Sequence, residues 1–130
     1  MLAATIMPDH VHWLCALTGR LPVPRCVAKF KAATRSAFTV AGVSWQENFF
    51  EHRLRPGELA EVYARYVFMN PYRAGLLGRV DEWPHWRADE NAEFGFLAML
   101  VGGRLPPAVW FSEEWKGLGI DEGKVGEAPE

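Results

Sequence analysis

The sequence predicts a globular α/β protein, because segments with the apolar pattern of strands alternate with segments that have the pattern of helices. The composition agrees with this class, since 49% of the 130 residues are hydrophobic and 23% are charged. A chain of this length is expected to form a single domain with a modest core. It has no apolar run of about 18 residues and no signal-peptide pattern, so we expect a cytoplasmic protein.

The first half of the chain is expected to form one strand and one helix. Apolar and β-compatible residues dominate residues 3–17, and we expect a strand over residues 9–17. Gly19 and Pro22 then interrupt the chain, and apolar residues recur at helical spacing over residues 24–40. The stripe of this helix consists of Val23, Val27, Phe30, Ala33 or Thr34, and Ala37 or Phe38.

The second half is expected to form a strand and a longer helix. The strand is expected within residues 43–54, before a turn at Pro56 and Gly57. An apolar stripe predicts a helix over residues 58–69, and Pro71 is expected to end it. The stripe consists of Leu59, Val62, Tyr63, Tyr66 and Val67.

The charge is distributed unevenly along the chain. Residues 1–87 carry 11 Lys and Arg against 7 Asp and Glu, whereas residues 88–130 carry 3 against 9. A mildly basic body with an acidic tail permits binding to a polyanion, although many proteins with such a balance bind no nucleic acid. We therefore expect one domain over residues 1–88 and an acidic C-terminal extension over residues 89–130.

Two features are expected in this extension. Residues 94–101 have the pattern of a short helix, and the chain from Gly117 onward is rich in Gly and Glu. The second feature predicts a flexible end.

The pattern His10-Val11-His12 is the first that suggests chemistry. Residues two apart on a strand point to the same face, so both imidazoles are expected on one side, where they can hold one metal ion. Val11 and Trp13 are then expected on the opposite face, which helices would cover. Taken alone, this short pattern also fits two histidines with ordinary hydrogen bonds.

Tyr66 and Asn70 form the second pattern, four residues apart on one face of the predicted helix. A tyrosine hydroxyl can attack a phosphodiester when a cation polarises the phosphate, and the Asn70 amide can contribute to the ligand shell of that cation. Judged by spacing alone, a core tyrosine is the simpler interpretation, because Tyr66 belongs to the apolar stripe. Tyr63 and Tyr72 compete as nucleophiles, but neither has Asn, Gln or His four residues later.

Four segments of the chain together resemble a known family, the REP-associated tyrosine transposases, which are single-tyrosine HUH transposases. The segments are MPDHVHWL, WQENFFEHRLR, ARYVFMNPYRAGLLGRV and DEWPHWRA, in the family's order and covering roughly residues 5–88. The RYVxxNPxRAGL pattern is far more specific than the histidine pair alone. The resemblance implies an α/β domain, a ferredoxin-like HUH nuclease fold with a central antiparallel sheet flanked by helices.

The resemblance also implies the roles of the site residues. His10, His12 and Asn70 are implied as ligands of Mg²⁺ or Mn²⁺, and Tyr66 as the nucleophile. The implied reaction cleaves single-stranded DNA hairpins through a 5′-phosphotyrosine link and later rejoins the strand. In related transposases a dimer can share sites, so Tyr66 can serve its own metal or that of a partner in a homodimer.

Basic side chains are the candidate phosphate contacts. Two pairs on the first predicted helix, Arg25 with Lys29 and Lys31 with Arg35, are each four residues apart and so lie on one side of it. A helix face that is simply exposed to solvent would explain these basic pairs equally well. The full set of candidate DNA contacts is Lys29, Lys31, Arg35, Arg53, Arg55 and Arg73. Trp45, Phe49 and Phe50 can stack on bases, but their aromatic character favours a place in the core.

Two other functions compete with strand transfer. Family members carry a strand and a helix before the histidine strand, whereas Met1 lies nine residues ahead of His10, so we expect a partial domain. A non-catalytic DNA-binding remnant of a transposase is therefore the alternative. Histidine-triad nucleotide hydrolases also place histidines alternately on a strand, but Leu14 occupies the position of their third histidine.

Overall fold

The computed structural model describes residues 1–17, 19–51, 53–112 and 125–127. The chain forms two compact units. The first contains Met1–Ala16 and Leu54–Leu118, described as far as Ser112, and the second contains Leu17–Arg53 and the described strand near the C-terminus. Both histidines and the tyrosine of the predicted site belong to the first unit.

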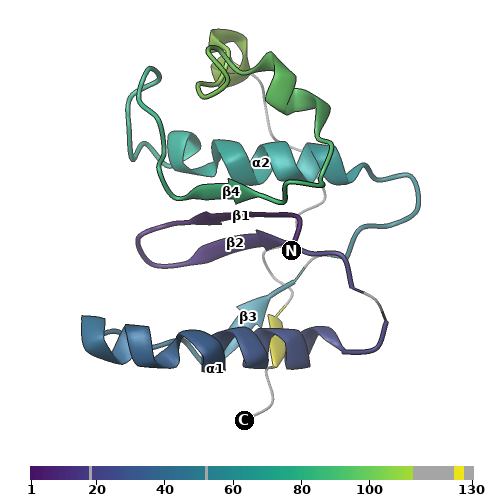
Figure 1. Cartoon of the computed structure of the whole chain (residues 1–130), viewed down its shortest axis with the longest axis vertical. Coiled ribbons are helices and arrows are strands. Elements are labelled where there is room, and N and C mark those ends of the chain that lie inside the picture. Colours follow the sequence, from purple (N-terminus) through teal and green to yellow (C-terminus); the bar gives the residue numbers. More distant parts are fainter. Residues whose placement is uncertain (18, 52, 113–124, 128–130) are drawn as a thin grey trace. The chain divides into compact units, whose positions relative to one another are not determined.

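A three-stranded antiparallel sheet forms the centre of the first unit (Figure 1). Its middle strand, β1 (Ala3–Ile6), pairs with β2 (Val11–Leu14) on one side and β4 (Trp86–Ala88) on the other. The sequence predicted β2 but missed β1. Alanines are weak strand formers, so β1 depends on pairing along both of its edges and not on local propensity.

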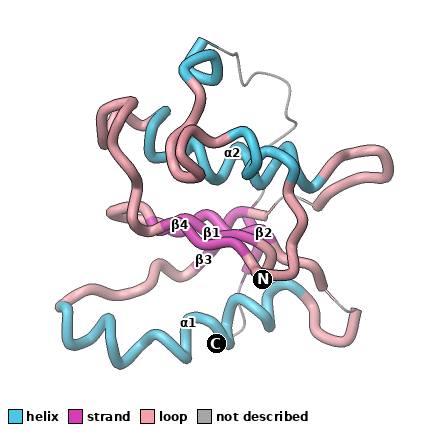
Figure 2. The backbone as a smooth tube through the Cα atoms, turned by 45° about the horizontal axis from the view of Figure 1, so that its top comes forward, coloured by secondary structure: helices cyan, strands magenta, loops and turns pink. Residues whose placement is uncertain are grey.

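Helix α2 (Ala60–Arg73) covers one face of this sheet (Figures 1 and 2). Beneath it, Ala3 and Thr5 of the middle strand are completely buried. One broad face of the helix is buried against the sheet and against the chain after residue 88. Its members are Tyr63, Ala64, Val67, Phe68, Met69, Pro71 and Tyr72.

Pro71 does not end this helix, contrary to the prediction. The helix continues to Arg73, and Ala74 closes it with an N–H that donates to the Asn70 carbonyl (2.9 Å). Proline in the last turn removes only one intrahelical hydrogen bond, and the ring of Pro71 is fully buried in the core. As a result, Tyr66, Asn70 and Arg73 lie on one continuous helix.

The chain after residue 88 contributes to the same core. The short helix predicted over residues 94–101 is present as a 3-10 helix, Gly95–Met99, and a second one follows at Ala108–Ser112. They bring Phe96 and Trp110 against Phe68, with ring centroids 5.8 and 6.4 Å apart. Packing therefore continues beyond the expected domain end, while the division at residue 88 stays a prediction.

The second unit is built on helix α1 (Val23–Ala41), which the sequence predicted to within one residue at each end. Gly42 ends the helix in the left-handed region at φ 74°, where glycine is favoured. The Trp45 ring stacks on Phe38 at 4.4 Å, and its indole N–H donates to the Thr34 hydroxyl (2.7 Å). Trp45 is thus a packing residue, as expected.

A small sheet completes this unit. Strand β3 (Asn48–Phe50) pairs with β5 (Val125–Glu127). The rest of the expected flexible end lies outside the described residues. Throughout both units the predicted fold class, an α/β protein with an antiparallel sheet and helices, is confirmed. No described helix is long and apolar enough to cross a membrane.

Replacing Trp110 with alanine should strongly destabilise the first unit. The side chain is 1% exposed and packs on Phe68 and Phe96, so its removal leaves a large cavity. We expect a loss of about 3–5 kcal/mol in the free energy of unfolding, measured by urea denaturation. Val109→Ala is the control, because Val109 is 62% exposed. Equal stability of the two variants would contradict this account of the core.

Candidate active site

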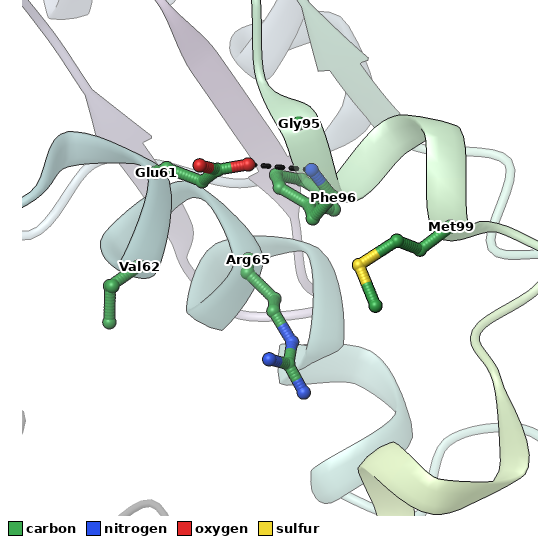
Figure 3. Close-up of a pocket in the computed structure, with 6 residues that line it drawn as sticks. All are labelled: Glu61, Val62, Arg65, Gly95, Phe96 and Met99. Atoms are coloured by element: carbon green, nitrogen blue, oxygen red, sulfur yellow. Dashed lines mark hydrogen bonds between the residues drawn. The ribbon is translucent and has the colours of Figure 1, made fainter.

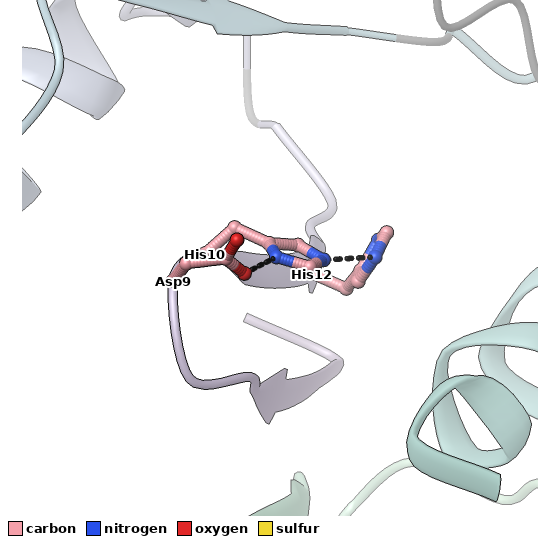
Figure 4. A network of polar contacts seen from close by, with 3 residues as sticks. All are labelled: Asp9, His10 and His12. Atoms are coloured by element: carbon pink, nitrogen blue, oxygen red, sulfur yellow. Dashed lines mark hydrogen bonds and ion pairs between the residues drawn. The ribbon is translucent and has the colours of Figure 1, made fainter. Parts of the chain in front are cut away.

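The two histidines lie at the start of β2 and face each other. Nε2 of His10 is 3.1 Å from Nε2 of His12, and the ring planes are nearly perpendicular (Figure 4). By the strand register, His12 lies opposite Thr5 on the face that α2 covers. We expected this face to be the chemical one, but Leu14, the next side chain on it, packs against the buried core. The expectation that helices cover the Val11 and Trp13 face stays a prediction.

The spacing of the two nitrogens fits a shared metal ion. Two ligands at a right angle on an ion about 2.1 Å away lie about 3 Å apart, close to the observed separation. Among the described residues no cluster of three His, Cys, Asp or Glu side chains could hold a metal ion, so a third ligand from this part of the chain would be of another type. The packed position of Leu14 also excludes the arrangement of a histidine triad.

Asn70 is the predicted third ligand, and it lies on α2 four residues after Tyr66. Its amide Nδ2 is buried and has no hydrogen-bond partner in the described part of the chain, and the same holds for the hydroxyl of Thr5. Buried polar groups normally have partners, so this unpaired N–H group is suited to an acceptor such as a phosphate oxygen, whereas a cation would bind the amide oxygen Oδ1. Two imidazoles and one amide oxygen can together hold a divalent cation and leave positions open for phosphate oxygens, although the imidazoles do not select Mg²⁺ or Mn²⁺ over other metals.

Tyr66 contacts the histidine pair from α2. Its ring centroid is 6.2 Å from that of His12, in an edge-to-face arrangement, and the side chain is half-buried. The guanidinium carbon of Arg73 lies 4.6 Å from the Tyr66 ring centroid. Of the predicted site residues, the fold thus brings together His10, His12, Tyr66 and Arg73, all from one chain. Their functional roles stay predictions.

His12 is held in its neutral form. Burial, and then the nearby charges of His10 and Arg73, lower the pKa of His12 to about 4. A neutral imidazole has a lone pair available for a metal, whereas an imidazolium does not. The electrostatics of the site therefore favour the form of His12 that binds cations.

Asp9 is the site residue that sequence analysis missed. Its Oδ1 accepts a hydrogen bond from Nδ1 of His10 (2.5 Å), and this contact lowers the pKa of the Asp9 carboxyl. Adjacent residues on a strand point to opposite faces, so their order gave no reason to expect a contact. The contact forms because both residues precede β2, in the turn closed by the Met7 N–H on the His10 carbonyl (2.8 Å).

The candidate DNA contacts are divided between the two units. Arg73 lies at the site and Arg55 precedes α2, whereas Lys29, Lys31, Arg35 and Arg53 belong to the second unit. Most are exposed, but the Lys31 ammonium donates to the carbonyls of Gln46 (2.5 Å), Glu47 (3.2 Å) and Asn48 (3.4 Å). Lys31 therefore joins α1 to the chain before β3. His52, which has no assigned role, lies outside the described residues.

A cavity of about 480 Å³ lies between the first turns of α2 and the 3-10 helix Gly95–Met99 (Figure 3). It is lined by Glu61, Val62, Arg65, Gly95, Phe96 and Met99. Across it, Glu61 accepts a hydrogen bond from the Phe96 N–H (2.6 Å), which links the start of α2 to the following 3-10 helix. None of the predicted site residues lines this cavity, so it is separate from the candidate site.

Comparison with curated proteins shows a similarity to a bacterial transposase. A protein of Haemophilus influenzae is 26% identical to this chain over 110 residues, and its curated name places it among the REP-associated tyrosine transposases. The resemblance to that family is confirmed. The match covers 71% of this chain and 61% of the relative's length. No protein-family model matches the chain, and no solved structure matches it.

The titration of His12 tests the electrostatics of the site. In the metal-free protein, NMR titration of the His12 ring should give a pKa of about 4. Arg73→Gln should raise the pKa of His12, because it removes a nearby positive charge. Because the unfolded chain takes up this proton near pH 6.5, the folded state should lose stability as the pH falls from there toward 4.

Arg79→Gln is the control for this titration, since Arg79 lies over the Phe111 ring and does not contribute to the lowered pKa of His12. A native His12 that titrates near pH 6.5 would contradict the described burial.

Proposed function

We propose that this protein is a divalent-metal-dependent transposase that cleaves and rejoins single-stranded DNA hairpins. The observation that carries the proposal is the convergence of two elements. The turn and strand bring two imidazole nitrogens to 3.1 Å from each other, and α2 places the Tyr66 ring against His12. The named relative supports the reaction class, because strand transfer is what a transposase performs.

The proposed cation is Mg²⁺ or Mn²⁺, held by His10, His12 and Asn70. When bound, such an ion polarises a phosphate oxygen and stabilises the charge that develops during attack. Neutral imidazoles suit this role, and the lowered pKa of His12 keeps that ring neutral at physiological pH. The Asn70 amide completes the protein ligands from the turn of α2 that follows Tyr66.

Tyr66 is the proposed nucleophile. Its hydroxyl oxygen attacks the scissile phosphorus and loses its proton to water, while the bond from phosphorus to the 3′ oxygen breaks. The products are a 5′-phosphotyrosine link and a free 3′-hydroxyl, which takes up a proton. Attack by a 3′-hydroxyl on the link reverses the process and releases Tyr66, so the phosphodiester energy is kept and no ATP is needed.

Arg73 supports this assignment from the last turn of the same helix. Its guanidinium lies over the Tyr66 ring, where a phosphate attacked by Tyr66 would gain a positively charged neighbour. The other proposed phosphate contacts are Lys29, Arg35, Arg53 and Arg55, because the Lys31 ammonium is already bound to backbone carbonyls. They would hold the DNA backbone without reading its sequence.

Tyr66→Phe should abolish covalent attachment to DNA. The test incubates the protein with a labelled single-stranded hairpin and Mn²⁺ and separates protein–DNA adducts on a denaturing gel. Tyr63→Phe is the matched control, because Tyr63 lies on the same helix but donates its hydroxyl to Glu58 and is buried. Persistence of the adduct in Tyr66→Phe would refute the assignment of the nucleophile.

The second candidate is a DNA-binding protein without cleavage activity. It stays an alternative because the similarity covers 61% of the relative's length, so the relative's whole activity is only a proposal for this chain. In either case, binding to single-stranded DNA should weaken as salt is added. A plot of the logarithm of the binding constant against the logarithm of the salt concentration should have a slope of about −0.7 for each phosphate contact.

Arg35→Gln should therefore reduce that slope by about 0.7 when binding is measured by fluorescence anisotropy between low and moderate salt. Arg104→Gln is the control, because Arg104 pairs with Glu82 (3.4 Å) and is not a proposed contact. An unchanged slope for Arg35→Gln would remove Arg35 from the interface. Binding without any adduct for the unaltered protein would favour the second candidate.

A further inference from the structure

Asp9 makes a contact that the proposed reaction does not use. Its carboxylate oxygen Oδ1 lies 2.5 Å from Nδ1 of His10, the ring nitrogen that faces away from His12 (Figure 4). The side chain of Asp9 is 87% exposed, so its carboxylate could be fully hydrated instead. It nevertheless accepts a hydrogen bond from the imidazole.

This hydrogen bond determines where the proton of a neutral His10 lies. Nδ1 donates to the carboxylate, which leaves a lone pair on Nε2, the nitrogen 3.1 Å from Nε2 of His12. The lone pair of His10 therefore faces His12, where the proposed cation would bind. Histidines that bind metals generally donate their other N–H to a carboxylate or carbonyl, which orients the ring and makes the free nitrogen more basic.

The two histidines of the pair also differ in how their rings are held. His12 is half-buried and packs edge-to-face on Tyr66, so its neighbours fix its orientation. The His10 side chain is 48% exposed, and its partners are Asp9 and His12. An exposed imidazole rotates readily unless a hydrogen bond restrains it, which makes Asp9 the group that holds His10 in place.

We propose that Asp9 is a positioning residue that fixes the His10 ring and its tautomer so that Nε2 is presented to a divalent cation. The inference rests on the proposed metal site and adds to it a residue that does not touch the ion. A carboxylate in this position increases metal affinity through His10 alone. It contributes no ligand of its own, because its oxygen is bound to the far side of the ring.

Metal affinity of the DNA-free protein tests this role directly. Isothermal titration with Mn²⁺ should show affinity about 10–100-fold weaker for Asp9→Ala than for the unaltered chain. Asp9→Asn should fall between them, because an amide oxygen accepts the hydrogen bond but carries no charge. Glu90→Gln changes the net charge equally and should bind like the unaltered chain.

Glu90 suits this control because it is exposed and follows Asp89, whose N–H donates to the Leu2 carbonyl, beyond the end of the sheet opposite to His10. Thermal melting of all variants by circular dichroism confirms that each is folded. The His10 tautomer, read from ¹⁵N NMR of the imidazole, should carry its proton on Nδ1 in the unaltered chain. It should shift toward Nε2 in Asp9→Ala, which a merely structural role of Asp9 would not cause.

The outcomes separate this inference from the proposed function. If His12→Ala loses Mn²⁺ binding while Asp9→Ala binds as tightly as the unaltered chain, the role of Asp9 is overturned and the metal site stands. If the unaltered chain binds no Mn²⁺, the metal site and the role of Asp9 fail together. If Asp9→Ala binds Mn²⁺ more weakly and its His10 tautomer is changed, the result supports both the metal site and the role of Asp9.

Discussion

The packing of α2 on the sheet is the constraint on which the candidate site depends. Ala3 and Ala64 are both fully buried at this interface, and such small side chains allow a helix and a sheet to approach closely. Phe68 then fills the space between the helix, β4 and the later 3-10 helices. Once this face is buried, the rotation of the helix is fixed. Tyr66, two residues before Phe68, then lies at the edge of the core against His12.

Different physical means hold the two imidazoles of the site. His12 depends on burial under α2, which also keeps it neutral, while His10 is exposed and depends on a hydrogen bond to Asp9. The positive charge of Arg73 acts on Tyr66 and on His12. The guanidinium lies over the Tyr66 ring, and its charge contributes to the lowered pKa of His12. The core and the site are thus parts of one packing arrangement, in which burial controls charge.

The sequence predicted α1 well because its periodic stripe and the glycine after it are local features. The family pattern also led to His10, His12 and Tyr66, which the fold brings together, while the roles of these residues and of Asn70 stay predictions. It could not predict β1, whose alanines become a strand only by pairing with two neighbours. Nor could it predict that α2 continues through a proline, because burial of the ring offsets the lost hydrogen bond only in the folded core.

The charged groups were the least predictable part of the site. The order of Asp9 and His10 in the chain gives no sign of their contact, which requires the turn before β2. Spacing on α1 placed Lys31 beside Arg35 on an outer face, yet its ammonium is bound to three backbone carbonyls. A long flexible side chain such as that of lysine can reach several polar groups, and which of them lie nearby depends on the tertiary fold. Periodicity therefore predicted the elements but not these contacts.

The central proposal is that the paired imidazoles bind one ion beside the tyrosine nucleophile, and a crystal structure of the Mn²⁺-soaked protein tests it most directly. Anomalous scattering should show one manganese peak about 2.1–2.3 Å from Nε2 of both His10 and His12, on the side that faces Tyr66. A manganese ion bound elsewhere, or imidazoles that stay hydrogen-bonded to each other in excess Mn²⁺, would contradict the account.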